Sequence, residues 1–335
     1  TWTLPAAVAC CACDVLTCNG SGVLSWAAAG GSGANVALSN LCSVAIADDM
    51  IITNGYGLVI GHSAQLVAGD NPANVVAEFQ MVGTGSADTS MHLIAHSADA
   101  EPPIIRFAKS RNATIGSHTI VQACDIIGSI DYFGCDGGNM QPYAARIMVK
   151  VDGTPGVNDM PGRMEFLTTP DGAQASALAM TINNQGEITM PKQPAFSIYP
   201  SGDSCNCNET GDDTLHTIVF GSERFDIGCN ATTTTFTAPV TGKYMLSGNW
   251  TFEGFGACHT SGKFQIVTTA KTYASSINPR STFNSTCGVG GFTRTVIADM
   301  AACNTAVMKI AIGPSGQAKT ADTNVNTMFM GTLLT

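Results

Sequence analysis

The stretch "FTAPVTGKYMLSGNW", Phe236–Trp250, holds a proline, two glycines, a tyrosine and a tryptophan, but no residue typical of a catalytic site. Pro239 cannot donate a hydrogen bond to a sheet, so it marks a strand edge or a turn. Gly242 suits a turn in which a side chain would strain the backbone dihedrals. Tyr244 and Leu246 lie two residues apart and therefore share one face of the strand that follows. The stretch predicts a corner between two strands of a β-sandwich.

The composition favours neutral β-structure. Of the 335 residues, 44% are hydrophobic and only 12% are charged, about half of the usual charged share of roughly 25%. Thr, Ser, Asn, Gly and Ala fill the gap. Such a chain is globular rather than disordered, and it suits turn-rich sheets or fibrous trimers that bury neutral polar faces between chains. The length allows two or three domains.

The charge pattern argues against two kinds of partner. The net charge is −10 and no cluster of Lys and Arg occurs, so a nucleic-acid partner is not expected. No run of 18 apolar residues occurs, and no membrane span is predicted. The sequence begins at Thr1 without a methionine or a signal peptide, and we expect further residues before it.

The thirteen cysteines cannot all pair, because their number is odd. The cluster "ACCACDVLTCNG", residues 9–20, is too compact for a tetrahedral zinc site and has no histidine beside it. Others lie in turn-like settings that favour Asp, Gly, Ser or Asn; these are Cys135, Cys205, Cys207, Cys229 and Cys303. A structural zinc site, a disulfide framework and misassigned residues all stay open as interpretations.

Short apolar or alternating runs, separated by Gly, Asn, Asp and Pro, predict an all-β fold. We expect strands at 57–61, 103–109, 118–124, 145–151, 163–169, 216–221, 263–269, 293–300 and 306–313. One helix is expected at Asn35–Ile46. A Gly/Ser hinge is predicted at Ala27–Asn35, and two prolines in Met190–Phe196 place the main domain boundary there.

Two segments resemble fibre proteins of tailed phages. Near the N-terminus, Trp26 follows the turn "NGSG", as in linker and shaft segments of such fibres. Residues 92–191 resemble a module of marine-phage tail and fibre proteins through "RFAKSR", "GSIDYFG", "VDGTPG", "NDMPGRMEF" and "INNQGEI". The resemblance implies an N-terminal shaft or attachment segment at 1–85 and a trimeric β-rich body at 86–192.

The C-terminal part, 195–335, resembles the C1q/TNF-like jelly roll. It opens on Ala-Phe-Ser, carries the motif F-x-x-P-x-x-G-x-Y, and closes on an aromatic-x-G-x-L-L strand. The signature residues are Phe196, Phe236, Pro239, Gly242, Tyr244, Phe329, Gly331 and Leu333. The resemblance implies a jelly-roll head that forms tight trimers around a hydrophobic axis. The expected fold is thus an all-β, elongated trimeric fibre with a β-rich shaft and body and this head.

Catalysis is not predicted, because the chain has no G-x-S-x-G elbow, no P-loop and no H-E-x-x-H motif. Carboxylates that cleave glycans face each other at about 5–9 Å. The candidate pairs are Asp48/Asp49, Asp125/Asp131 and Asp212/Asp213. Adjacent residues point to opposite faces of an extended chain, and acidic turns are mostly only turns. A tailspike glycan depolymerase stays an alternative.

No cofactor is predicted, although the sequence allows calcium. Asp203, Asp212 and Asp213 offer oxygen ligands of the kind that Ca²⁺ prefers, and domains of the resembled jelly-roll family sometimes bind calcium. The alternative is a solvated acidic loop.

The predicted function is a structural virion fibre, on the tail or the capsid, that adsorbs to a host. Its expected partners are two further copies in a homotrimer, other virion proteins at the N-terminal end, and a glycan or protein of the host cell surface. The alternative is a secreted eukaryotic C1q/TNF-like binding protein, which the cysteines and six N-x-[ST] sequons favour. The sequons lie at Asn19, Asn112, Asn208, Asn230, Asn249 and Asn284, and several arise by chance in a chain so rich in Asn and Thr.

Receptor binding is expected in loops of the head, because loops vary while the sandwich keeps its packing. The stretch Lys271–Phe292 is predicted to be one long loop. Its residue types anchor proteins and glycans alike; the candidates are Tyr273, Arg280, Phe283 and Phe292. The alternative is a surface excursion whose aromatics cover the core. A second candidate, Ser201–Asp213, would suit a cation-bridged sugar.

Overall fold

The computed structural model describes residues 14–18, 24–28, 58–62, 64–68, 77–202, 208–283, 288–317 and 322–335. Contacts divide the chain into two compact units, one of 1–65 with 77–90 and one of 66–76 with 91–335. The elements of the described residues are strands, apart from the short helix α1 (Pro279–Phe283), and the predicted all-β class is confirmed. The helix expected at Asn35–Ile46 lies outside the described residues. No helix within the described ranges is long and apolar enough to cross a membrane.

The first unit contains two pairs of short strands. Strands β1 (Asp14–Cys18) and β2 (Leu24–Ala28) are antiparallel. Strands β3 (Leu58–Ile60) and β4 (Phe79–Met81) are parallel. The strand expected at 57–61 is therefore confirmed.

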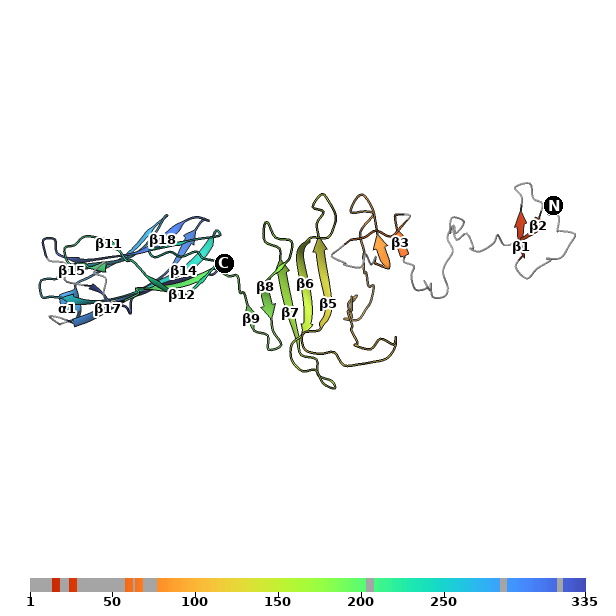
Figure 1. Cartoon of the computed structure of the whole chain (residues 1–335), viewed down its shortest axis with the longest axis horizontal. Helices are drawn as coiled ribbons and strands as arrows, with labels where there is room; N and C mark the ends of the chain where they lie inside the picture. The colour runs from red at the N-terminus through yellow and green to blue at the C-terminus, as the bar shows by residue number, and fades with distance from the viewer. Residues whose placement is uncertain are drawn as a thin grey trace. The chain divides into compact units, whose positions relative to one another are not determined.

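The second unit contains a five-stranded antiparallel sheet in the order β5-β6-β7-β8-β9, which we call the body sheet. Its strands are β5 (Ile126–Phe133), β6 (Tyr143–Val151), β7 (Gly162–Thr168), β8 (Ala177–Ile182) and β9 (Ile188–Thr189). Figure 1 shows β5 to β8 side by side in chain order. Each strand pairs with the next one along the chain, so short turns are enough to build the sheet.

The strands expected at 103–109 and 118–124 are wrong, since both segments are irregular. Phe107 crosses over the face of the body sheet instead of pairing at its edge. A Cβ on Gly128 of β5 would lie 2.7 Å from Phe107 Cβ, so only glycine leaves room for this crossing. Arg111 then fastens the segment to Asp125.

Two further sheets of the second unit form a sandwich, which we call the head. The first sheet has the order β12-β10-β20-β14-β17, with β19 paired to β14. Its strands are β10 (Ala195–Tyr199), β12 (Ser222–Ile227), β14 (Gly242–Phe255), β17 (Gly288–Met300), β19 (Asp322–Thr323) and β20 (Met328–Leu333). The second sheet has the order β11-β18-β15-β16, with β13 paired to β18. Its strands are β11 (His216–Thr217), β13 (Thr235–Thr237), β15 (Ser261–Thr268), β16 (Thr272–Ile277) and β18 (Thr305–Gly313).

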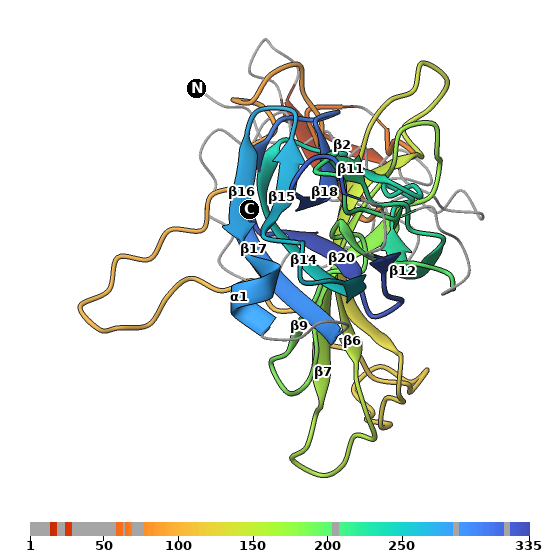
Figure 2. The same cartoon turned by 90° about the vertical axis from the view of Figure 1, so that its left-hand side faces the viewer.

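The strand order of the head is that of a jelly roll. Its main strands in chain order are β10, β13, β14, β15, β16, β17, β18 and β20. Numbered one to eight, they give one sheet with the order 1-8-3-6 and one with the order 2-7-4-5. These are the two interlocking Greek keys of a jelly roll. Figure 2 shows β16, β15 and β18 in one layer and β17, β14 and β20 in the other.

The core of the head lies between these two sheets and is rich in aromatic side chains. Fully buried members include Phe196, Phe236, Tyr244, Trp250 and Phe329. Burial alternates along β14, because successive side chains of a strand point to opposite faces. Four of the signature residues, Phe196, Phe236, Tyr244 and Phe329, therefore lie in this core.

The stretch from Phe236 to Trp250 is the corner that the sequence predicts. Phe236 belongs to β13 of the second sheet, and Tyr244 belongs to β14 of the first. Exposed Pro239 lies in the bend between them. The Tyr244 hydroxyl donates to the carbonyl of Val240 at 2.8 Å, which closes the corner on itself, and burial raises the pKa of Tyr244.

The reason predicted for Gly242 is wrong. Gly242 starts β14 and is not among the residues with a positive φ. A Cβ there would collide with the carbonyl oxygen of Thr335 and would lie 2.6 Å from Leu333 Cδ1. Close approach of the last strand, rather than a strained turn, requires glycine at this position.

Candidate functional site

The outer face of the first head sheet carries apolar and neutral side chains in rows across the strands. Ile297 of β17 pairs with Met245 of β14, and the row continues through Thr332 of β20 to Ala195 of β10. The next row contains Thr295, Ser247, Met330, Ser197 and Phe225. We call these two rows the neutral face. Ile297 is 61% exposed and Phe225 is 48% exposed, so apolar area on this face stays in contact with water.

Several polar side chains of the neutral face and the row beside it already have hydrogen-bond partners. Ser247 Oγ and Thr295 Oγ1 lie 2.8 Å apart. In the adjacent row, Thr293 donates to Asn249 Oδ1 at 3.3 Å, and Asn249 donates to the carbonyl of Asn326 at 3.1 Å. Burial of hydroxyls and amides that are already bonded costs little. The face can therefore be covered by another protein surface at low cost.

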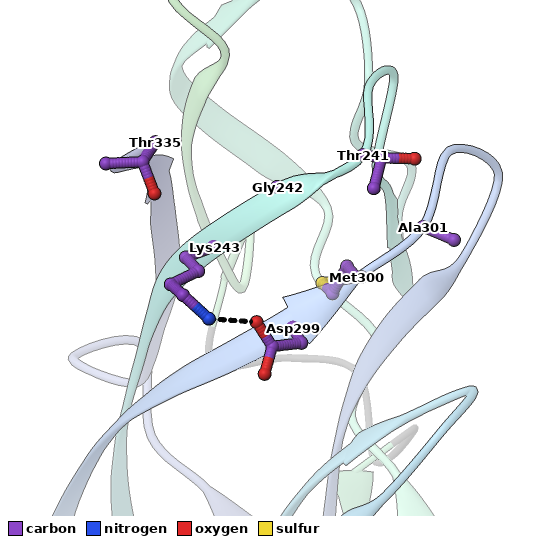
Figure 3. Close-up of a pocket in the computed structure, with 7 residues that line it drawn as sticks. All are labelled: Thr241, Gly242, Lys243, Asp299, Met300, Ala301 and Thr335. Atoms are coloured by element: carbon purple, nitrogen blue, oxygen red, sulfur yellow. Dashed lines mark hydrogen bonds and ion pairs between the residues drawn. The ribbon is translucent and has the colours of Figure 1, made fainter.

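A pocket of about 370 Å³ marks the charged end of this sheet (Figure 3). Its lining comprises Thr241, Gly242, Lys243, Asp299, Met300, Ala301 and Thr335. Figure 3 shows Lys243 and Asp299 facing each other from adjacent strands, with Nζ 2.5 Å from Oδ1. Their side chains are 56% and 82% exposed, and such pairs stabilise little. The pocket forms a polar rim beside the neutral face.

The body sheet also leaves apolar side chains uncovered. Within 77–192, the buried hydrophobic residues are Val121, Met148 and Val151. Ile130 and Tyr132 of β5 are 47% and 51% exposed. A cavity of about 260 Å³ lies on the sheet and is lined by Phe107, Ile127, Gly128, Ser129, Ile130, Ile147, Val149 and Met164. A single sheet layer buries its apolar face only against a second layer. Over this face the described residues place Phe107 of an irregular segment, and apolar side chains such as Ile130 stay exposed.

The predicted long loop at Lys271–Phe292 is wrong, because most of the stretch is regular structure. It contains β16, α1 and the start of β17. Tyr273 lies on β16 with its ring 5.2 Å from Lys271 Nζ. Phe292 lies on β17 and stacks on Phe252 with 6.4 Å between centroids. The small Ala and Ser residues of β16 favoured the prediction of a loop, but the segment is a strand whose alternate side chains pack against the core.

The four receptor candidates are thus distributed over three elements. Tyr273 and Phe292 pack against the core, as the alternative interpretation of the stretch expects. Arg280 is exposed on α1. The Phe283 side chain lies outside the described residues. The binding roles of all four stay predictions.

The proposed calcium ligands are only partly described. Asp203 lies outside the described residues. Asp212 Oδ1 accepts from the backbone N–H of Thr214 at 3.1 Å, and Asp213 Oδ1 lies 3.5 Å from Lys263 Nζ. No group of three His, Cys, Asp or Glu side chains that could hold a metal occurs in the part of the chain that the structure describes. Calcium binding stays a prediction.

Asp125 and Asp131, one of the pairs considered for glycan cleavage, are each held by an arginine. Arg111 binds Asp125 in a bidentate pair at 2.6 and 2.7 Å, and Arg146 binds Asp131 at 2.9 and 3.2 Å. Hydrogen bonds from Arg111 and from the backbone of Gln122 hold the pKa of Asp125 well below its usual range. A general acid needs a raised pKa instead, so Asp125 is unsuited to that role. Asp48 and Asp49 lie outside the described residues.

Among the cysteines whose side chains the structure describes, five are exposed free thiols, namely Cys124, Cys135, Cys229, Cys258 and Cys303. Three of them have a positive φ, with 68° at Cys124, 56° at Cys229 and 67° at Cys303. Glycine, Asn and Asp are the residues that tolerate this region. The turn settings inferred for Cys229 and Cys303 are confirmed, and neither residue is part of a disulfide framework.

Arg294 is a residue that the sequence analysis missed. It lies on β17 at an inward-facing position, and the side chains at 292, 296, 298 and 300 share its face. Those neighbours are Phe, Val, Ala and Met. Period-two alternation along "GFTRTVIADM" was the available signal, since the arginine falls on the apolar parity of the strand.

Comparisons with known proteins return solved structures that each cover 43% of this chain. No protein-family model and no curated protein matches the chain. Among solved structures, the globular domain of zebrafish complement 1qA is 16% identical, with a TM-score of 0.33, and covers 43% of this chain and 98% of its own. Murine APRIL at pH 8.5 is 10% identical, with a TM-score of 0.31, and covers 43% of this chain and 100% of its own. At these scores the jelly-roll assignment rests on the strand order and register.

Proposed function

We propose that the chain is a non-enzymatic fibre protein of a tailed-phage virion, which assembles as a homotrimer and recognises a host surface through its jelly-roll head. The observation that supports it most is the neutral face of the head. A sheet face that exposes apolar side chains, is free of charge across two rows and already pairs its Ser247 and Thr295 hydroxyls suits burial against identical copies.

The body sheet supports assembly independently of the head. Its exposed apolar residues and its single layer need cover that the described chain does not supply. Further copies of the chain, arranged around an axis, would bury these apolar residues and would also protect the open sheet edges. The phage origin and the threefold number rest on the sequence resemblance of residues 92–191 and 195–335.

A secreted C1q/TNF-like binding protein is the second candidate, and the jelly-roll topology fits it equally. The structure distinguishes sequons that are exposed to solvent from a sequon that is buried. Asn208 is 2% exposed, and its amide donates to and accepts from the backbone of Val219, so it cannot carry a glycan in the folded chain. Asn112 is exposed and is the better test.

Two observations on the native source distinguish the candidates. Immunogold labelling with antibodies against the head should mark fibres on virions, and mass spectrometry should find Asn112 unmodified. A glycan on Asn112 together with unlabelled particles would contradict the phage proposal and favour the secreted protein.

A further inference from the structure

Arg294 places a guanidinium among apolar side chains at the side of the head where β16 and β17 lie, which we call the flank. Across that flank, β16 contributes Tyr273, Ser275 and Ile277, and β17 contributes Phe292 and Val296, the inward residues on either side of Arg294. Both strands are at the edge of their sheets. Figure 2 shows β16 and β17 at the same side of the sandwich, next to α1.

The guanidinium has fewer partners than its burial requires. Nη1 donates to Ser275 Oγ, whereas Nε is buried and has no hydrogen-bond partner. Among the described residues, no Asp or Glu forms an ion pair with it. Arg294 as a whole is half-buried, so its charge is partly withdrawn from water without an anion beside it, and the buried Nε donor without an acceptor adds a cost.

Two arginines that bind a carboxylate through two hydrogen bonds indicate what Arg294 lacks. Arg111 and Arg146 each bind a carboxylate side-on, through Nε and Nη2. Arg294 donates to Ser275 through Nη1. Its other side, formed by Nε and Nη2, has no acceptor in the described chain. The planar fork matches the two oxygens of a carboxylate.

We propose that the flank between β16 and β17 is a carboxylate-binding site, in which Arg294 binds the ligand carboxylate through Nε and Nη2 while Ser275 holds the guanidinium in place. The apolar side chains on either side would contact the body of the ligand and exclude water, which strengthens a charged hydrogen bond. Edge strands lack a neighbour on one side, so they can part slightly to admit the group. This inference deepens the proposed binding function by naming a ligand class.

The carboxylate has two conceivable sources, and one set of variants distinguishes them. It can belong to a sugar acid of a surface glycan or to an acidic side chain of a second copy. D-glucuronate and D-glucose form a matched pair of probes that differ in the carboxylate. Arg294→Met removes the charge and retains the length, Arg294→Lys retains the charge without the fork, and Arg224→Met is the control at an exposed arginine of edge strand β12.

Calorimetric titration at constant ionic strength should show saturable binding of glucuronate and none of glucose by the full chain. Binding should weaken about tenfold or more in Arg294→Met, less in Arg294→Lys, and not in Arg224→Met. Without glucuronate, Arg294→Met should melt about 2–4 °C higher than the parent, because an unpaired charge has been removed.

Loss of assembly in Arg294→Met, without glucuronate binding by the parent, would assign the carboxylate to a second copy and would also support the site. If the parent does not bind glucuronate and the assembled mass of Arg294→Met is unchanged, the proposal is overturned. The titration measures glucuronate binding in any assembly state, whereas sedimentation measures the assembly state itself. Failure of the proposed site can therefore be distinguished from failure of the proposed trimer.

Discussion

Phe196 stacks on Phe236 with ring centroids 4.4 Å apart and an angle of 14° between the rings. The first ring comes from β10 of one head sheet and the second from β13 of the other. Two motifs that lie far apart in sequence thus meet face to face and join the two layers. Phe329 adds an edge contact to Phe196 at 5.1 Å, so three signature residues form one aromatic cluster.

Truncation of this cluster should destabilise the head strongly. Phe236→Ala removes a fully buried ring from between the two sheets and should lower the free energy of unfolding by about 3–5 kcal/mol. Val240→Ala is the matched control, because Val240 is 45% exposed in the adjacent bend. Urea denaturation followed by tryptophan fluorescence measures both. Equal midpoints for the two variants would contradict the core described here.

Gly331 should not tolerate a methyl group. A Cβ there would lie 2.7 Å from Leu246 Cδ2 and 2.7 Å from Phe196 Cε1. We expect Gly331→Ala to destabilise by about 1–3 kcal/mol through overpacking. Gly291→Ala serves as the control, since its Cβ would meet nothing closer than 3.6 Å. If Gly331→Ala melts at the temperature of the control, the close packing of β20 is wrong.

The sequence predicted the head better than the rest because its signals are local. Large aromatics at alternating positions, and glycine or proline at a corner, follow directly from strand geometry. The reason for Gly242 could not be found in this way, since the obstacle is Thr335, which lies far along the chain. Contacts between distant segments leave no mark in the local pattern.

The expected strands at 103–109 and 118–124 failed for a related reason. Both contain β-branched and apolar residues, but a strand also needs a hydrogen-bonded neighbour, and propensity does not supply one. The long loop predicted at Lys271–Phe292 was wrong partly because β16 is rich in small residues, which are typical of loops. Arg294 was overlooked because polar Thr293 and Thr295 surround it, and only its parity reveals that it points inward.

The cysteines in left-handed turns give a stabilising prediction. Cys303 has a φ of 67° in the turn between β17 and β18, and Asn tolerates this region better than Cys. Cys303→Asn should therefore stabilise the head by roughly 1 kcal/mol or less. Cys258→Asn, at an exposed cysteine that is not among the positive-φ residues, should give no gain. Differential scanning calorimetry compares the two, and an equal effect would contradict the backbone explanation.

The Arg111–Asp125 pair should resist acid. Because the pKa of Asp125 is lowered mainly by its hydrogen bonds from Arg111, the pair contributes stability above the ordinary Asp pKa of 3.8. That contribution is lost only as the pH falls through the lower folded value. An NMR titration of the Asp125 carboxyl should therefore find its midpoint below 3.8. Arg111→Gln should raise the midpoint, and an unchanged midpoint in this variant would disprove the stated cause.

A charge in the neutral face should prevent assembly without unfolding the head. Ile297 is 61% exposed in the single chain, so Ile297→Asp should leave the melting of the isolated chain nearly unchanged. In a trimer the same aspartate would be buried without a partner, which costs several kcal/mol. Val289→Asp is the matched control, because Val289 is 62% exposed on the same strand but outside the two rows. Dissociation by both variants would argue against an interface confined to the neutral face.

Sedimentation equilibrium of the full chain at micromolar concentration tests self-assembly most directly. The proposed homotrimer predicts a single species of three times the chain mass of 34.6 kDa, with Ile297→Asp sedimenting as the single chain. A parent protein that sediments as a monomer of 34.6 kDa would contradict the account.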